Sequence, residues 1–395
     1  MVSEAGIVDV VVVGGGISGV SIGHELAARH SVAVLDMEAA LAYHTTGRSA
    51  AMYLQTYGGP TVQALTAASR ELLDELAVLT PLAMLYIASS GRGAAIDTLY
   101  DDVRPLVPDV VLLSGEEAAC RQPLLRSDRV DRALLEPGAM AIDVHALHQH
   151  FVRGLRQRGG SVAVRARVCS AERDSGVWTI GCADGRSWRA RAVVDAAGAW
   201  ADEVAALFGG APIGLNPLRR TAFIVDAPPT LAPPMVADID GAYYFKPDAG
   251  RLLCSPADET PQAPSDARPD ELETARAIES INEVTTLRIR HVRSAWAGLR
   301  SFVADRMPVV GYDDMVDGLF WYAAQGGYGV QTAGALARVG AALFDGVPLP
   351  TQVADLGVNP AVLAPRRSAL ASPPGLTDDE GASAGSSTPM TGGHL

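Results

Sequence analysis

Three glycines near the start of the chain have the spacing of a dinucleotide-binding turn. Gly14, Gly16 and Gly19 form the pattern Gly-x-Gly-x-x-Gly directly after a run of β-branched residues. In such a turn the first glycine bends the chain, the second lets the backbone approach a pyrophosphate, and the third lets a helix pack on a strand. Asp36 ends the next apolar run, where its carboxylate can accept hydrogen bonds from a ribose. These four residues predict dinucleotide binding; the alternative is an ordinary glycine-rich turn.

Three further segments are rich in small residues that would let a cofactor approach the backbone. They are residues 43–51 (YHTTGRSAA), residues 193–200 (VVDAAGAW) and residues 324–331 (AQGGYGVQ). The last segment predicts a glycine-rich helix start, and a helix N-terminus aimed at a flavin ring would stabilise its anionic reduced form. A plain NAD-dependent dehydrogenase would enter a crossover helix where the first segment lies. Together the segments favour FAD, although each alone could be a structural turn.

Hydrophobic patterns predict the elements that must position these residues. The predicted helices run from the glycine motif to about residue 29 and over residues 61–76, 144–158 and 326–341, with another starting near residue 270. The predicted strands lie over residues 7–13, 31–35, 161–168, 177–182, 188–195, 220–225, 242–245, 251–254, 296–303 and 309–312. A turn is expected over residues 246–250, and a polar loop over residues 261–269.

The composition is that of a folded protein rather than a disordered chain. The 395 residues are 48% hydrophobic, and the formal net charge is −13. This charge disfavours nucleic acid and anionic lipid as partners. The absence of a basic leader and of a long apolar run predicts a cytoplasmic protein without a transmembrane segment. The four cysteines are scattered and the histidines lack ligand spacing, so no disulfide framework and no metal site are expected.

Five longer sequence motifs, spread along the chain, allow a comparison with known protein families. HTTGRSAA, LRRTAF, YYFKPDAG, WAGLRSFVAD and AAQGGYGVQT occur in that order. In sequence and order they resemble the FAD-dependent D-amino-acid oxidoreductases, the family of glycine oxidase and sarcosine oxidase. Within that family they are most similar to bacterial D-arginine dehydrogenases. The resemblance covers residues 8–367.

The resemblance implies a fold class and a division into domains. The fold class is α/β (α+β overall), with a Rossmann-like FAD-binding domain and an inserted substrate domain built on a mostly antiparallel sheet. The FAD-binding domain would be discontinuous, over residues 7–80, 142–207 and 296–367, and the substrate domain would comprise residues 81–141 and 208–295. Residues 371–395, mostly Ser, Gly, Pro, Thr and Asp, are expected to form a disordered tail.

The resemblance also implies which residues hold FAD. The cofactor would be bound non-covalently, since residues 300–312, where the sarcosine oxidases attach their flavin, contain no cysteine. The implied cofactor-binding residues are Gly14, Gly16, Ile17, Ser18, Gly19, Asp36, Met37, His44, Thr45, Thr46, Arg48, Ser49, Ala50, Val168, Ala197, Gly198, Trp200, Gly298, Arg300, Gly326, Gly327, Tyr328, Gly329, Val330 and Gln331.

An amino-acid substrate presents a carboxylate, and the guanidinium fork of arginine matches a carboxylate in two hydrogen bonds. The resemblance assigns this role to Arg220 and Arg300; the alternative for any single arginine is a surface ion pair. Tyr57 and Tyr244 would complete the clamp, with Tyr57 on a mobile lid. Gly327 and Gln331 would lie near the substrate and the flavin edge. The implied reaction is hydride transfer from the substrate Cα to the flavin, and the sequence offers no obvious general base. His44 is a candidate only by its proximity to the cofactor loop, and a contact with FAD is favoured for it.

The expected side-chain pocket departs from the D-arginine dehydrogenases. Ala83 is placed where those enzymes carry an acidic residue for the substrate guanidinium, and Met52 replaces a histidine. Without a carboxylate partner a buried cationic side chain is costly. Met52, Ala83 and Met235 therefore predict a substrate with an apolar or neutral side chain rather than D-arginine.

The electron acceptor is expected to be something other than oxygen. Sarcosine oxidases use a lysine over the flavin to promote the reaction with oxygen, whereas the single lysine of this chain, Lys246, falls in the predicted turn. This favours a D-amino-acid dehydrogenase with an unidentified acceptor. Two alternatives stay open at this point: a glycine- or sarcosine-type secondary amine oxidase in a biosynthetic pathway, and a non-catalytic dinucleotide-binding scaffold or redox sensor.

Overall fold

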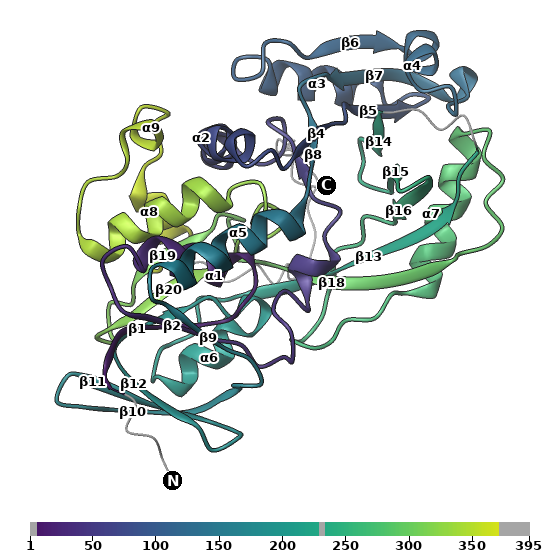
Figure 1. Ribbon diagram of the computed structural model, residues 1–395. Helices are drawn as coiled ribbons and strands as arrows, with labels where there is room; N and C mark the ends of the chain where they lie inside the picture. Colours follow the sequence, from purple (N-terminus) through teal and green to yellow (C-terminus); the bar gives the residue numbers. More distant parts are fainter. Residues whose placement is uncertain (1–5, 229–233, 371–395) are drawn as a thin grey trace, which may run out of the picture.

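Two large β-sheets form the body of the protein, and helices pack on both of them (Figure 1). The structure is a computed structural model that describes residues 6–228 and 234–370. The predicted tail, residues 371–395, lies outside the described residues. No helix in the described ranges is long and apolar enough to cross a membrane.

The first sheet has eight strands and a parallel centre. β1 is central, with β2 and β9 on one side of it and β12 on the other; β10, β11, β20 and β19 extend the sheet beyond β12. The strand bounds are β1 Val8–Val13, β2 Val32–Leu35, β9 Ser161–Ala163, β10 Val168–Asp174, β11 Val177–Cys182, β12 Ser187–Asp195, β19 Val309–Tyr312 and β20 Leu319–Ala323. β1 is nearly continuous valine because both of its faces are covered.

Helices cover the first sheet on both faces. α1 (Ile17–Leu26), α5 (Val144–Gln157) and α8 (Ala333–Asp345) pack together on one face, and α6 (Ala201–Leu207) lies on the other (Figure 1). Because α1 begins four residues after the end of β1, its start lies at the carboxyl end of that strand. This is the edge at which open α/β sheets bind ligands.

The second sheet has nine strands and is antiparallel except for the β14–β5 pair. Its strands are β5 Met84–Ser89, β6 Val111–Ser114, β7 Val130–Glu136, β13 Asn216–Asp226, β14 Met235–Asp238, β15 Tyr244–Asp248, β16 Arg251–Ser255, β17 Thr260–Pro261 and β18 Ser294–Phe302. One face carries an apolar cluster that includes Met84, Tyr86, Met235 and Tyr244. We call this the clamp-side face. α7 (Glu271–Val284) packs on the opposite face.

Shorter elements connect the two sheets. β3 (Met52–Tyr53), β8 (Met140–Ile142) and β4 (Leu79–Pro81) form a third, small sheet. The remaining helices are α2 (Pro60–Glu75), α3 (Gly93–Val103), α4 (Gly115–Arg121) and α9 (Thr351–Ala354). The long pair β13 and β18 extends from beside the first sheet toward α7 (Figure 1).

The structure confirms the mixed α/β fold class and corrects several predicted elements. Residues 164–167 leave the predicted strand between β9 and β10. Lys246 lies inside β15 rather than in a turn, and is only 8% exposed. The helix predicted from Gly326 begins at Ala333, because residues 326–332 form turns. No elements were predicted between β4 and β8, where the structure has β5, α3, β6, α4 and β7. The domain boundaries remain a prediction.

Candidate active site

A cavity of about 640 Å³ extends from the glycine turn of the first sheet to arginines of the second. It is lined by residues of β1, β2, β10 and β20, by the segment that follows β12, and by residues of β13, β15 and β18. Most predicted cofactor residues are among its lining residues: Gly14, Gly16, Ile17, Ser18, Asp36, Met37, His44, Thr45, Thr46, Arg48, Ser49, Ala50, Val168, Ala197, Gly198, Trp200, Gly298, Arg300, Gly326, Gly327, Gly329 and Val330. Of the predicted substrate residues, Arg220, Tyr244, Arg300 and Gly327 line it too.

The glycine turn is built as the motif requires. Gly14 has a φ of 112°, a conformation that favours glycine. Gly19 is not a lining residue; a Cβ on it would lie 1.8 Å from the Gly14 carbonyl oxygen, so its role is to let α1 pack on β1. The carboxylate of Asp36 accepts hydrogen bonds from the N–H groups of Gly15 (2.7 Å) and Glu38 (2.8 Å). Burial raises the pKa of Asp36.

His148 is a supporting residue that the sequence analysis missed. Its Nε2 lies 3.0 Å from the carbonyl oxygen of Gly15, and the side chain is buried. Its position among the inward-facing apolar residues Leu147 and Phe151 of α5 was the available signal. Within residues 6–228 and 234–370, no three histidine, cysteine, aspartate or glutamate side chains come together to hold a metal ion.

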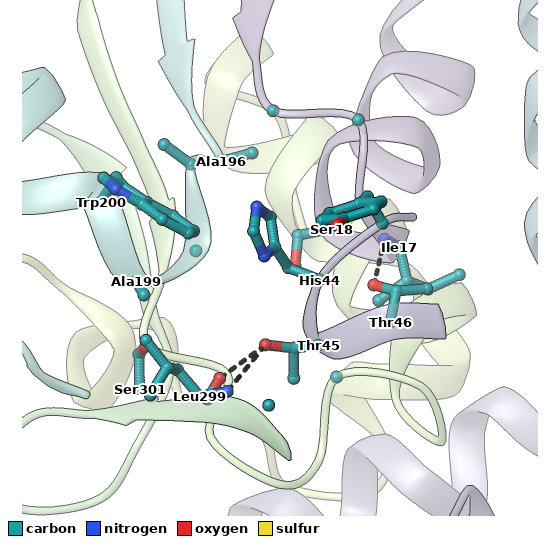
Figure 2. A pocket seen from close by; sticks show the side chains of 18 of the residues that line it. Ile17, Ser18, His44, Thr45, Thr46, Ala196, Ala199, Trp200, Leu299 and Ser301 are labelled. Atoms are coloured by element: carbon teal, nitrogen blue, oxygen red, sulfur yellow. Dashed lines mark hydrogen bonds between the residues drawn. The ribbon is translucent and has the colours of Figure 1, made fainter. Parts of the chain in front are cut away.

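The polar loop after β2 is hydrogen-bonded both to α1 on the first sheet and to β18 of the second sheet. The Oγ1 of Thr46 accepts a hydrogen bond from the Ile17 N–H at 3.0 Å, while the Oγ1 of Thr45 donates to the Leu299 carbonyl oxygen at 2.7 Å (Figure 2). Arg48 donates to the Ala297 carbonyl oxygen at 2.8 Å. The loop thus connects the start of α1 with β18.

His44 and Arg48 are occupied by protein contacts. The His44 ring lies 4.7 Å from the Trp200 ring, and its Nε2 is 2.9 Å from Oε1 of Glu38. Arg48 also pairs with Asp266 at 2.6 Å. Its guanidinium therefore holds backbone of β18 and a carboxylate, in addition to lining the cavity.

Several buried polar atoms of the lining have no hydrogen-bond partner within the described part of the chain. They are Nε2 of Gln325, Oγ of Ser301 and Nδ1 of His44. A Cβ added to Gly16 would meet only Oγ1 of Thr46, at 3.2 Å, which leaves open space beside the turn. A ligand with many donors and acceptors and a pyrophosphate, such as FAD, fits these atoms and this space.

The end of the cavity on the second sheet carries the predicted carboxylate clamp. Arg220 is 6% exposed and donates to the Asp258 carbonyl oxygen at 3.0 Å and to Glu259 at 3.1 Å. Its Nη1 has no partner among the described residues. Burial and the charge of Arg300 lower the pKa of Arg220 to about 10, so it stays a cation at neutral pH. Arg306, which the sequence analysis missed, forms two hydrogen bonds to Glu259, at 2.9 and 3.0 Å.

Tyr57 and Tyr328 lie next to the lining residue Gly327, outside the cavity lining. The Nη1 of Arg300 donates to the Tyr57 hydroxyl at 3.3 Å, and the rings of Tyr57 and Tyr328 are 4.9 Å apart. A Cβ on Gly327 would lie 2.4 Å from the Tyr57 oxygen, so only glycine fits between this hydroxyl and the cavity. Neither tyrosine is a lining residue: Tyr57 contacts Arg300 of the clamp, and Tyr328 packs against Tyr57.

Three predicted site residues have other surroundings. Gln331 is buried away from the lining and binds the backbone of Leu54 (3.3 and 3.4 Å) and the hydroxyl of Thr66 (2.8 Å). Met52 and Met235 lie in the apolar cluster of the clamp-side face and do not line the cavity.

Ala83, which directly precedes β5, does not line the cavity. Ala83 packs with the cluster on the opposite face of the second sheet, whereas its neighbour Met84 belongs to the clamp-side face. Successive side chains of a strand point to opposite faces, so a one-residue error in an alignment selects the wrong face. Met84 is apolar, and the carboxylate paired opposite it, Glu136 of β7, accepts hydrogen bonds from Gln55 and Thr56.

The comparisons with known proteins agree on one family. Residues 9–343 match the model of the family described as FAD dependent oxidoreductase (DAO). Glycine oxidase of Geobacillus kaustophilus is 26% identical over 335 residues, which cover 79% of this chain and 86% of that protein. Mitochondrial dimethylglycine dehydrogenase of Mus musculus is 24% identical over 371 residues, 84% of this chain and 41% of that protein. The chain spans about a third to two fifths of the length of the first curated relatives it matches.

The solved structures agree in fold. The crystal structure of glycine oxidase from Geobacillus kaustophilus superposes with a TM-score of 0.80 at 23% identity, covering 92% of this chain and 99% of that one. That of L-proline dehydrogenase from P. horikoshii gives a TM-score of 0.77 at 20% identity, covering 91% and 97%. With the family model, the glycine turn and the fitting cavity, these findings show that the chain belongs to the FAD dependent oxidoreductase family and that its cofactor is FAD.

Proposed function

We propose that this protein oxidatively deaminates a D-amino acid. The observation that carries the proposal is the unpartnered Nη1 of the buried Arg220, which lines the same cavity as Arg300 and the glycine turn. A buried guanidinium N–H without a partner requires an acceptor, and a carboxylate supplies the strongest one. An amino acid held there by its carboxylate would place its Cα and amine in the cavity that holds the cofactor.

FAD, when bound, accepts a hydride from the substrate Cα. The residues of this chain contribute binding and orientation: Arg220 and Arg300 hold the carboxylate, Tyr244 adds a hydroxyl, and Gly327 lets the substrate approach closely. As the hydride leaves Cα the substrate amine loses a proton and becomes an imine, and the released imino acid hydrolyses in water to a keto acid and ammonia. His44 keeps a cofactor-side role, since its ring packs on Trp200.

The proposed substrate has an apolar or neutral side chain rather than that of D-arginine. Met84 and Met235, neighbours on β5 and β14, do not line the cavity, but they belong to the apolar cluster that includes the lining residue Tyr244. Lys246 lies two residues beyond Tyr244 on β15 and is buried, so its ammonium would repel a second cation. The carboxyl group of Glu136 accepts hydrogen bonds from Gln55 and Thr56, so it is already engaged and is not expected to pair with a cationic substrate side chain.

The test is anaerobic mixing of the purified holoprotein with D- and L-amino acids while the flavin absorbance at about 450 nm is recorded. Bleaching by apolar D-amino acids but not by D-arginine is the expected result. Bleaching by D-arginine alone would refute the side-chain proposal, and bleaching only by glycine or N-methyl amino acids would indicate a secondary amine substrate. A holoprotein that no amine bleaches would refute amine oxidation.

We also propose that the enzyme is a dehydrogenase. The described cavity lining contains no lysine to promote a reaction with oxygen. Reduced holoprotein is therefore expected to reoxidise slowly in air and rapidly with an artificial quinone. Equal rates with both acceptors would contradict the proposal.

Non-covalent FAD is a further expected result. Residues 300–312 contain no cysteine, so no thioether to the flavin is expected there. Acid precipitation should leave the yellow colour in the supernatant, and mass spectrometry should give the mass of the unmodified chain. A yellow pellet with a correspondingly heavier chain would contradict it.

A further inference from the structure

A buried carboxyl group supports the segment that carries Tyr57. Glu136, the last residue of β7, is 1% exposed. Its Oε1 accepts a hydrogen bond from the Gln55 N–H at 2.8 Å, and its Oε2 accepts one from the Thr56 hydroxyl at 2.5 Å. Gln55 and Thr56 immediately precede Tyr57, in the connection between β3 and α2. Glu136 has no cationic partner in the described ranges, so these hydrogen bonds are its stabilising contacts.

The same segment is held from the cofactor side. Gln331 binds both backbone groups of Leu54, and it follows the glycine-rich turn that lines the cavity. Residues 54–57 are thus fastened at one end by Gln331 and in the middle by Glu136. Beyond these two supports, the Tyr57 hydroxyl accepts a hydrogen bond from Arg300. The residue that contacts Arg300 thus directly follows two residues that are hydrogen-bonded to Glu136 of the second sheet.

We propose that Glu136 is a positioning residue of the substrate clamp, which fixes residues 54–57 and thereby the contact of Tyr57 with Arg300. The inference rests on the proposed function, in which Arg300 binds the substrate carboxylate. Glu136 does not line the cavity, so its effect on the substrate passes through Tyr57.

The hydrogen bonds of Glu136 also respond to its proton. The Oγ1 of Thr56 lies 2.9 Å from the Tyr86 hydroxyl, which makes a chain from Tyr86 through Thr56 to Glu136. An ionised Glu136 only accepts, so Thr56 donates to it and Tyr86 donates to Thr56. When Glu136 gains a proton it donates to Thr56, Thr56 donates to Tyr86, and both hydrogen bonds reverse. Burial raises the pKa of Glu136 to about 7, so both arrangements occur near neutral pH.

The groups that face Glu136 do not supply another switch in this range. Tyr53 on β3 and Tyr86 on β5 have pKa values raised by burial, so both hydroxyls stay neutral. Asp109, before β6, is the other carboxylate, and its charge raises the pKa of Glu136. We therefore expect Glu136 to be the group that titrates if KM changes near pH 7.

Two substitutions separate support from simple folding. Glu136→Leu removes both acceptors and leaves the partly buried Gln55 N–H without its acceptor, so KM for the amino acid that bleaches the flavin should rise about tenfold with kcat within threefold. Glu136→Gln keeps an acceptor for Gln55 and a donor for Thr56. It should restore KM to within threefold of the original and abolish any change of KM between pH 6 and 8. FAD content and melting temperature establish that both variants are folded.

A double-mutant cycle tests whether the effect passes through Tyr57. In a Tyr57→Phe background, Glu136→Leu should raise KM by less than threefold, because the contact it positions is already lost. A full tenfold effect in that background, or an unchanged KM in the single variant, would overturn the positioning role. So would a pH dependence of KM that persists in Glu136→Gln.

Amide hydrogen exchange of residues 52–58 gives a readout that needs no turnover. At one pH, Glu136→Leu should accelerate exchange of this peptide about tenfold, and Glu136→Gln should leave it near the original rate. Unchanged exchange in Glu136→Leu overturns the inference even if amine oxidation is established. Faster exchange in a holoprotein that oxidises no amine supports the anchoring by Glu136 and refutes the proposed function alone.

Discussion

Replacing Arg220 by methionine is expected to lower kcat/KM for the amino-acid substrate by about 10²- to 10³-fold, mainly through KM. The variant loses a buried charged donor whose Nη1 has no partner among the described residues, and such a loss costs about 2–5 kcal/mol in a binding site. Glu259 keeps its two hydrogen bonds from Arg306, so no unpaired carboxylate is left behind. Steady-state kinetics with the bleaching amino acid measure the effect.

The adjacent Arg219 provides a matched control. It precedes Arg220 on β13 and therefore points away from the clamp-side face, where it pairs with Asp258 and Asp270 at 3.0 Å. Arg219→Met should lower kcat/KM far less than Arg220→Met does, because Arg219 does not line the cavity and the buried carboxylate of Asp258 keeps its hydrogen bonds from the N–H and hydroxyl of Thr221. Equal losses in the two variants would show that the clamp has been assigned to the wrong residues.

Replacing Gly19 by alanine should give a protein without FAD. The new Cβ would lie 1.8 Å from the Gly14 carbonyl oxygen and 2.9 Å from its carbon, and backbone atoms cannot rotate away as a side chain can. α1 would have to move off β1, which distorts the turn and lowers the free energy of unfolding by about 3 kcal/mol. The ratio of flavin to protein absorbance and a urea titration measure the two effects.

Gly16→Ala separates loss of packing from loss of cofactor contact. A Cβ at residue 16 meets only Oγ1 of Thr46, at 3.2 Å, so stability should change by less than about 1 kcal/mol. The methyl group would nevertheless fill the space that a pyrophosphate needs, and the Kd for FAD should rise at least about tenfold. A Gly19→Ala protein that binds FAD like the original would contradict this account of the turn.

The cofactor half of the site could be predicted because its chemistry is local. Gly14, Gly16 and Asp36 depend on one turn and one short strand, and their spacing in the sequence already encodes that geometry. The polar loop after β2 was foreseen by composition alone. Its partners were not, because Arg48 and Thr45 bind backbone of β18, some 250 residues later in the chain.

The substrate half depends on strand alternation and register, which a single sequence specifies weakly. Ala83 and Met84 exchange faces with a shift of one residue. Lys246 resembled a turn residue because proline, aspartate and glycine follow it, yet β15 continues through the proline to Asp248. Glu136 ends an ordinary strand, and nothing in the sequence indicates that its carboxyl group binds Gln55 and Thr56, which lie some 80 residues earlier in the chain.

The strand order of the first sheet dictates when the protein can fold during synthesis. Val8 of β1 pairs with Ala190 of β12, and Val193 of β12 pairs with Leu319 of β20. The valine-rich first strand therefore leaves the ribosome long before its neighbour exists, and the sheet closes only after residues 319–323 have emerged. Such pairing slows folding and exposes an aggregation-prone strand meanwhile. Chains truncated before β20 would thus lack a sheet neighbour as well as part of the cavity wall, so FAD can be enclosed only after residues 319–323 have been synthesised.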